Sequence, residues 1–347
     1  MRPQNKAAIW ERAMRSSLHL TIVVACALVL APLQRAAAEA KEIRIGVQFG
    51  LTYLPTTIMQ SEHLVEAQAK ALGLGDVKVT WIQSAGGDAL NTDLLADSLD
   101  VAASGYTSFL ILWAKTKGRF ARGLFAYGHT PFTLVTANPD VKSVKDFTDK
   151  DRIAVPAVRS SLQAIYLEMA AEKAFGPDGI NRLDSLTVTR SHPDAMAALL
   201  GKTEIDTHFS VPPYVERELA VPGVHSLFQT EDVTGQPVSN GVMYATTKFY
   251  DANPKLIEAL QKALQQAIDL INTDKPRAAA IYLAATHDTI TPAALVAMMS
   301  GPRVGYEETP LGSMLLAGFM NKTGQIAMMP KDWKEMFFPV AYGLPGN

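Results

Sequence analysis

Cysteine is almost absent from this sequence of 347 residues. The one cysteine, Cys26, lies in an apolar N-terminal segment, so the chain beyond that segment has no disulfide, no thiolate nucleophile and no cysteine-based metal site. The formal net charge is only −2, which gives no sign of a nucleic-acid partner or of a polybasic membrane-binding surface. A hydrophobic content of 48% is typical of a globular protein, and the length favours two domains.

Familiar catalytic motifs are missing as well. No histidine belongs to a His-Glu-x-x-His motif, and the chain has neither a Gly-x-Ser-x-Gly nucleophile elbow nor a phosphate-binding P-loop. We therefore predict no catalytic residue, no metal site and no cofactor. An exported enzyme is the alternative interpretation, because a fold does not determine function by itself.

The first forty residues have the pattern of an export signal. A basic start precedes a short apolar run at residues 18–31, and the small residues at 36–40 suit cleavage by signal peptidase. The run is short for a membrane span. We predict cleavage near Ala38 or Ala40 and a periplasmic protein, with lipidation of Cys26 as the alternative. The basic residues are Arg2, Lys6, Arg12 and Arg15.

Strand-like and helix-like segments alternate along the rest of the chain, which indicates an α/β protein with βαβ units. The predicted strands are residues 43–47, 77–82, 101–104, 123–127, 132–137, 153–156, 186–189 and 241–246. Amphipathic stretches of helical length separate them. One of these helices is expected to begin at Pro254, with Asn253 as its N-cap.

Two βαβ segments, residues 77–104 and 186–210, resemble each other. Each contains a strand, an aspartate expected to cap a helix, an apolar helix face, a turn and a second strand. The aspartates and serines recur at identical intervals: Asp88, Asp100 and Ser104 in the first segment, and Asp194, Asp206 and Ser210 in the second. Generic α/β patterning is the alternative, but the spacing favours two similar lobes with a ligand cleft between them.

The order of these segments resembles that of periplasmic solute-binding proteins of ABC transporters, and most of all the nitrate/sulfonate/taurine-type family. The resemblance covers essentially the whole mature chain, and its carriers are residues 43–64, 95–108, 152–167, 198–210 and 246–264. It implies a type II periplasmic-binding-protein fold with two lobes, each a mixed sheet flanked by helices, and a cleft between them. Residues 41–128 and 247–347 would form lobe 1 and residues 129–246 lobe 2, with crossings near Gly128 and Thr246.

The loop after Pro156 is the main candidate for ligand contact. A strand, a loop and a helix N-terminus follow one another here, which is how α/β proteins present backbone N–H groups to polar or anionic ligands. The family pattern is Lys/Arg-Gly-Ser-Ser, whereas this chain has Ala-Val-Arg-Ser-Ser. Arg159 is expected to pair with an anionic group, or else to be an ordinary exposed arginine, and Ser160 or Ser161 to cap the helix.

Further candidates follow the other predicted strands. Gly86 and Gly87 would allow close approach of the ligand to the backbone of the facing lobe, beside a capping Asp88. Thr107 is expected to cap a helix, and Phe209 is either a ligand contact or part of the core. The remaining candidates are Gln48, Tyr53, Ser84, Ser104, Tyr106, His208 and Ser210.

The resemblance implies capture of a small polar or anionic organic molecule, such as a sulfonate or a carboxylate, by closure of the two lobes. The ligand would then be delivered to an ABC transporter permease. We expect a monomer that binds no nucleic acid. Aromatic candidates such as Tyr53 would also accommodate a flat heterocycle, and a ligand-sensing role is a further alternative.

Overall fold

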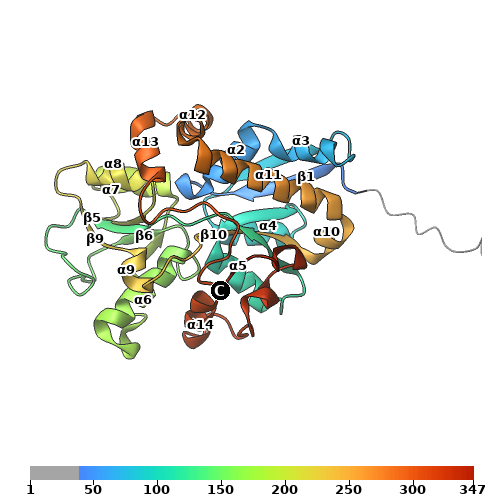
Figure 1. The fold of residues 1–347 in the computed structure, drawn as a ribbon. Helices are drawn as coiled ribbons and strands as arrows, with labels where there is room; N and C mark the ends of the chain where they lie inside the picture. Colours follow the sequence, from blue (N-terminus) through green and yellow to red (C-terminus); the bar gives the residue numbers. More distant parts are fainter. Residues whose placement is uncertain (1–38) are drawn as a thin grey trace, which may run out of the picture. The chain divides into compact units, whose positions relative to one another are not determined.

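Two five-stranded sheets organise residues 39–347, the residues that the computed structural model describes (Figure 1). Residues 1–38 of the predicted export signal, Cys26 among them, lie outside this range. The first sheet has the order β2 (Lys78–Gln83), β1 (Glu42–Val47), β3 (Val101–Gly105), β10 (Gly241–Thr246) and β4 (Ala121–Ala126). The second has the order β7 (Thr187–Thr189), β6 (Ile153–Val155), β8 (Thr207–Ser210), β5 (Thr133–Thr136) and β9 (His225–Gln229).

The two sheets share one topology. In the first, β1 pairs in parallel with β2 and β3, and β10 runs antiparallel to β3 and β4. In the second, β6 pairs in parallel with β7 and β8, and β5 runs antiparallel to β8 and β9. The predicted α/β class with two mixed sheets is therefore confirmed, and the two similar segments occupy equivalent places. Sequence reasoning missed β9.

A carboxylate contact explains why aspartate recurs in the two segments. The backbone N–H of Arg44 donates to Asp100 Oδ2 at 2.8 Å, and that of Arg152 donates to Asp206 Oδ2 at 2.9 Å. Each aspartate precedes the central strand of its sheet and thereby holds the neighbouring strand in register. The same requirement at both positions accounts for the repeat.

The prediction that Asp88 and Asp194 cap their helices is wrong. Helix α4 (Gly87–Leu95) begins after Gly86, and α7 (His192–Leu200) begins after Ser191, whose Oγ accepts from the N–H of Asp194 at 3.3 Å. Both aspartates lie instead in the first helical turn, where the helix dipole favours negative charge.

Helices cover both faces of the first sheet (Figure 1). Successive strand residues alternate between the faces, so Val101 and Ala103 pack into one core cluster and Ala102 into another. The first cluster includes side chains of α2 (Leu54–Ser61), α3 (Leu64–Ala71), α11 (Pro254–Thr273), α12 (Lys275–Thr286) and α13 (Pro292–Met299). The second includes side chains of α4, α5 (Tyr106–Lys115), α6 (Leu162–Phe175) and α14 (Ser313–Lys322). The remaining helices are α8 (Tyr214–Leu219), α9 (Thr230–Thr234) and α10 (Thr247–Ala252).

Helix α11 begins at Pro254, as predicted, and its inward residues Leu256, Leu260 and Leu264 are fully buried. Asn253 occupies the N-cap position, but its side chain makes no capping hydrogen bond. Its Oδ1 accepts instead from the backbone N–H of Ala40 at 2.7 Å, which ties the start of the described chain to this helix.

The chain returns from the second lobe to the first sheet at an earlier residue than predicted. Strand β10 (Gly241–Thr246) was placed at the end of the second lobe, but it pairs with β3 and β4 of the first sheet. The chain therefore returns before Gly241 and not at Thr246. The outward connection lies at residues 127–132, between β4 and β5. Within it Gly128 has a φ of 122°, and a Cβ there would collide with the carbonyl oxygen of Gly305.

A buried carboxyl joins α6 to the segment after α14. Gln325 Nε2 donates to Glu168 Oε1 at 2.8 Å and to Oε2 at 2.6 Å. Burial, and then the nearby charge of Asp184, raises the pKa of Glu168 to about 8. The Oε1 atom of Gln325 is buried without a hydrogen-bond partner among the described residues.

The raised pKa of Glu168 makes the stability of the protein depend on pH. Folded Glu168 keeps its proton up to a pH of about 8, whereas the unfolded chain releases it near the ordinary value of 4.5. Its contribution to the free energy of unfolding is therefore present below pH 4.5 and is lost as the pH rises to about 8. In urea denaturation at pH 5, 6, 7 and 8, the free energy of unfolding of the Glu168→Gln variant should increase relative to that of the wild type as the pH rises. Parallel pH profiles for the two proteins would contradict this account.

Candidate functional site

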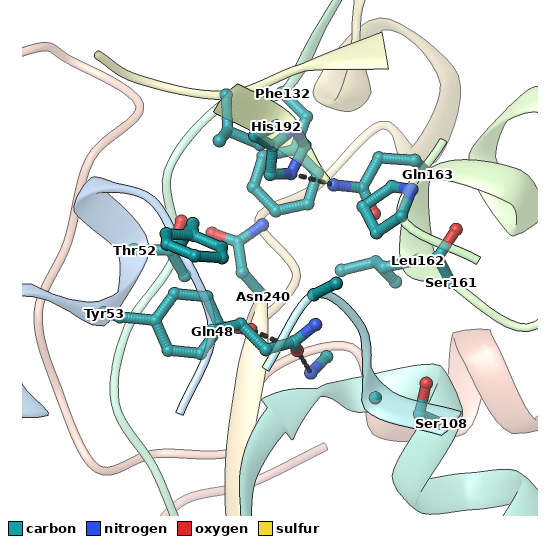
Figure 2. A pocket seen from close by; sticks show the side chains of 16 residues that line it. Gln48, Thr52, Tyr53, Ser108, Phe132, Ser161, Leu162, Gln163, His192 and Asn240 are labelled. Carbon is teal, nitrogen blue, oxygen red and sulfur yellow. Dashed lines mark hydrogen bonds between the residues drawn. The ribbon is translucent and has the colours of Figure 1, made fainter. Parts of the chain in front are cut away.

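A cavity lies between the two lobes, where the strands of both sheets end (Figure 2). Each parallel strand leads into at least one of the sixteen lining residues, and the two connections between the sheets contribute Phe132 and Asn240. The residues from the first lobe are Gln48, Phe49, Thr52, Tyr53, Ala85, Gly87, Gly105 and Ser108. Those from the second lobe are Pro156, Ser161, Leu162, Gln163, His192 and Val211.

Four helices begin at this cavity. Gly87 opens α4, Gly105 precedes α5, Ser161 precedes α6 and His192 opens α7, and all four residues line the wall. The first N–H groups of a helix have no intrahelical partner, and each N-terminus carries a charge of roughly +0.5. The cavity therefore combines backbone donors with a positive potential, which suits an anionic or acceptor-rich group.

The lining side chains carry no formal charge. None of the sixteen, all within the described part of the chain, is a lysine, arginine, aspartate or glutamate. Burial, and then the proximity of His208, lowers the pKa of His192 well below its ordinary value, so this imidazole is neutral. Recognition must therefore rely on amides, hydroxyls, aromatic rings and the backbone.

Gln48, a predicted residue, has a fixed amide orientation. Its Oε1 accepts from the Tyr53 hydroxyl at 2.7 Å, from Ser104 Oγ at 3.2 Å and from the Gly105 N–H at 3.2 Å. Because the oxygen is fully used, the amide nitrogen is left to face the cavity (Figure 2). Gln48 thus presents a hydrogen-bond donor to a ligand.

Asn240 presents a second donor. Its Oδ1 accepts from the backbone N–H of Thr130 and from Thr130 Oγ1, the latter at 3.3 Å. Thr130 Oγ1 in turn lies 2.8 Å from Thr52 Oγ1, another lining residue. The Asn240 nitrogen points toward the cavity (Figure 2).

Hydrogen bonds join the two lobes at two places. At the first, Ser160 Oγ donates to Asp88 Oδ2 at 2.6 Å, and Thr107 Oγ1 donates to the Ser160 carbonyl at 2.7 Å. At the second, the Leu51 N–H donates to the Pro212 carbonyl at 2.8 Å. The prediction that Thr107 caps a helix is therefore wrong, because α5 begins at Tyr106 after Gly105. Ser160 connects the lobes, and Ser161 caps α6 as expected.

The position of Arg159 contradicts its expected role in anion binding. Its side chain is 72% exposed and its Nε lies 3.4 Å from Asp184 Oδ2, outside the cavity wall. Arg159 stands directly before the two serines, where the family pattern has glycine, and its φ is 65°. Its backbone therefore adopts the left-handed conformation that favours glycine, while its side chain contributes nothing to the cavity.

Several other candidates lie behind the wall. Tyr106 and Phe209 belong to the core: the Tyr106 hydroxyl donates to Ser313 Oγ at 2.6 Å, and the Phe209 ring packs on Phe228. Fully buried Ser104 supports Gln48, and Ser84 Oγ donates to the carbonyl of Gly86 at 3.1 Å. The candidates that are outside the lining are Ser84, Gly86, Ser104, Tyr106, Thr107, Arg159, Ser160, His208, Phe209 and Ser210.

Sequence reasoning missed most of the wall. Gln163 and His192 sit in the first turns of helices that the strand–loop–helix pattern brings to the cleft, so that pattern could have found them. Phe132 and Asn240 lie in the connections between the sheets, and only the three-dimensional path of the chain brings them to the cavity.

A second, more open groove shares Gln48 and Phe49 with the cavity. It extends toward α8 and the end of α12, where the Arg217 guanidinium pairs with the Asp288 carboxylate. These charges lie outside the cavity wall.

Among residues 39–347, no helix is both long and apolar enough to cross a membrane.

Solved structures share this architecture over most of its length. The alkanesulfonate-binding protein SsuA from Xanthomonas axonopodis pv. citri, bound to MOPS, matches with 18% identity and a TM-score of 0.64 over 85% of this chain and 96% of its own. The periplasmic aliphatic sulphonate binding protein SsuA from Escherichia coli matches with 17% identity and a TM-score of 0.62 over 85% of this chain and 98% of its own. The periplasmic nitrate-binding protein NrtA from Synechocystis PCC 6803 matches with 15% identity and a TM-score of 0.55 over 71% of this chain and 66% of its own. No curated protein matches the chain.

The fold is therefore the two-lobed periplasmic-binding-protein fold, as the sequence predicted. The model of the NMT1-like family matches residues 36–285, which is more than half of the chain. The chain belongs to the NMT1-like family, and its structural neighbours include periplasmic sulfonate-binding and nitrate-binding proteins.

The wall allows a test of how tightly α4 is held. A Cβ at Gly87 would collide with the Oγ atoms of Ser104 and Ser108, whereas one at Gly105, also in the wall, would meet nothing within 4 Å. We expect Gly87→Ala to lower the free energy of unfolding by about 1–3 kcal/mol, because the collision forces α4 to shift. Gly105→Ala should change it by less than about 0.5 kcal/mol. Equal effects of the two substitutions in urea denaturation would refute this packing.

Proposed function

We propose that the protein is the solute-binding component of an ABC importer and captures a small polar or anionic organic molecule, such as a sulfonate or a carboxylate. The observation that carries this proposal is the convergence of four helix N-termini on one cavity whose lining has no acidic side chain. The family membership and the sulfonate-binding role of two similar structures agree with it. These neighbours are binding proteins and not enzymes.

The cavity offers two kinds of surface to such a molecule. The acceptor oxygens of its head group would bind the free backbone N–H groups that open α4 and α6 and the amide nitrogens of Gln48 and Asn240. The carbon skeleton would pack against rings and aliphatic groups such as Phe132 and Val211. Backbone dipoles can bind a buried anion without the cost of also burying a cationic side chain.

Lobe closure is the proposed means of capture. The wall is shared between the two lobes, so a molecule that contacts α4 and α6 together favours the closed arrangement over the open one. The hydrogen bonds of Ser160 with Asp88 and Thr107 belong to this closed arrangement. The closed protein would then deliver its ligand to a permease. In this proposal the protein works in the periplasm as a monomer after export.

Ligand binding should be visible as thermal stabilisation. A ligand at a hundredfold excess over its Kd stabilises the folded state by about 2.7 kcal/mol. We predict that a screen of sulfonates, carboxylates, amino acids and heterocycles gives hits among the organic acids. Stabilisation by the uncharged heterocycles alone would contradict the proposed class of ligand.

Two variants distinguish ligand binding at the cavity wall from ligand binding at Arg159. Gln48→Glu keeps an oxygen for the Tyr53, Ser104 and Gly105 donors but replaces the amide donor with a negatively charged oxygen. We expect it to weaken binding of the best acid at least tenfold, about 1.4 kcal/mol, in calorimetric titration. Arg159→Ala should leave the Kd unchanged, because its side chain lies outside the wall. The reverse pattern would place the anion at Arg159.

A further inference from the structure

A buried chain of hydrogen bonds runs from the cavity wall into the second lobe. Gln163 Nε2 lies 3.2 Å from His192 Nε2, His192 Nδ1 lies 2.9 Å from His208 Nε2, and His208 Nδ1 lies 2.6 Å from Glu218 Oε1. The four side chains come from α6, α7, β8 and α8. None is more than 7% exposed. The chain is therefore a built feature that the proposed capture of an anion does not use.

The direction of this chain follows from its chemistry. An amide nitrogen only donates, so His192 Nε2 must accept from Gln163. A neutral imidazole carries one proton, which is therefore on His192 Nδ1 and is donated to His208 Nε2. His208 then carries its own proton on Nδ1 and donates it to the Glu218 carboxylate. The hydrogen bonds from Gln163 through His192 and His208 to Glu218 are therefore mutually consistent and hold the Gln163 amide in this orientation.

The result is that one of the three lining amides presents an acceptor, whereas the other two present donors. Since Gln163 Nε2 is held by His192, the Oε1 atom of the same amide is left at the cavity, and no described residue donates to it (Figure 2). Gln48 and Asn240 have the opposite orientation, with their oxygens used and their nitrogens at the cavity. The wall is thus complementary to a molecule with acceptors on one part and a donor on another.

We propose that Gln163 determines specificity: the ligand carries an N–H or O–H group that donates to Gln163 Oε1, in addition to its acidic head group. This inference rests on the proposed function and narrows the ligand to amino- or hydroxyl-substituted organic acids. A simple alkyl acid in the cavity would cover the Gln163 oxygen without giving it a hydrogen-bond partner, which is costly. The histidines form a line and do not converge, and the described residues include no group of three His, Cys, Asp or Glu side chains that could hold a metal ion.

Matched probes test the proposal. Calorimetric titration would compare propionate with 3-aminopropionate and 3-hydroxypropionate, and ethanesulfonate with its 2-amino and 2-hydroxy derivatives. We expect the substituted acid of at least one series to bind about tenfold or more tightly than its parent. Equal affinities within each series would overturn the role of Gln163 while leaving the proposed function standing. No binding of any probe would overturn both.

Two substitutions assign the preference to Gln163. Gln163→Met has a similar length but no acceptor, so the ratio of affinities within a series should fall to about one. Gln163→Glu keeps an acceptor and adds a negative charge, so the ratio for the amino derivative should rise above that of the wild type. Each ratio is measured within one protein, so a general loss of stability cancels. A wild-type ratio in both variants would overturn the proposal.

Discussion

The parallel pairing of three strands in each sheet is the constraint on which the site depends. Because β1, β2 and β3 run in the same direction, their carboxyl ends lie at one edge of the first sheet, and β6, β7 and β8 do the same in the second. The helices that follow β2, β3, β6 and β7 must therefore begin at those edges. The two connections bring the edges together, so the helix N-termini meet around one cavity. The site is a consequence of topology before any particular side chain is considered.

Polar side chains then refine what the backbone provides. Burying a charged group costs several kcal/mol unless it is well paired, and the cavity wall avoids this cost by using amides whose orientations are set from behind. The Gln48 oxygen is held by Tyr53 and Ser104, the Asn240 oxygen by Thr130, and the Gln163 nitrogen by His192. The hydrogen-bond partners of the three amides thereby decide which of their atoms a ligand meets. The charged pair of Arg217 and Asp288 stays in the outer groove.

The sequence predicted the fold better than the site, for a physical reason. Strands and helices follow from local periodicity, and the recurring aspartates follow from the backbone contacts of Asp100 and Asp206. Gln48, Tyr53, Gly87 and Ser161 were found because they stand directly at strand ends or helix starts. Tyr106 was misplaced because the direction of a side chain depends on packing, and here its ring turns into the core. Asn240 could not be found, since its place at the cavity depends on where the chain returns to β10.

The central claim is that the solute binds at the helix N-termini, between the lobes, without a cationic side chain. The most direct test is a crystal structure of the protein with the organic acid that binds most tightly. We predict that its head group lies within hydrogen-bond distance of the backbone N–H groups at the starts of α4 and α6 and of the Gln48 nitrogen. An acid bound instead to Arg217 in the outer groove, or to Arg159, would contradict the account.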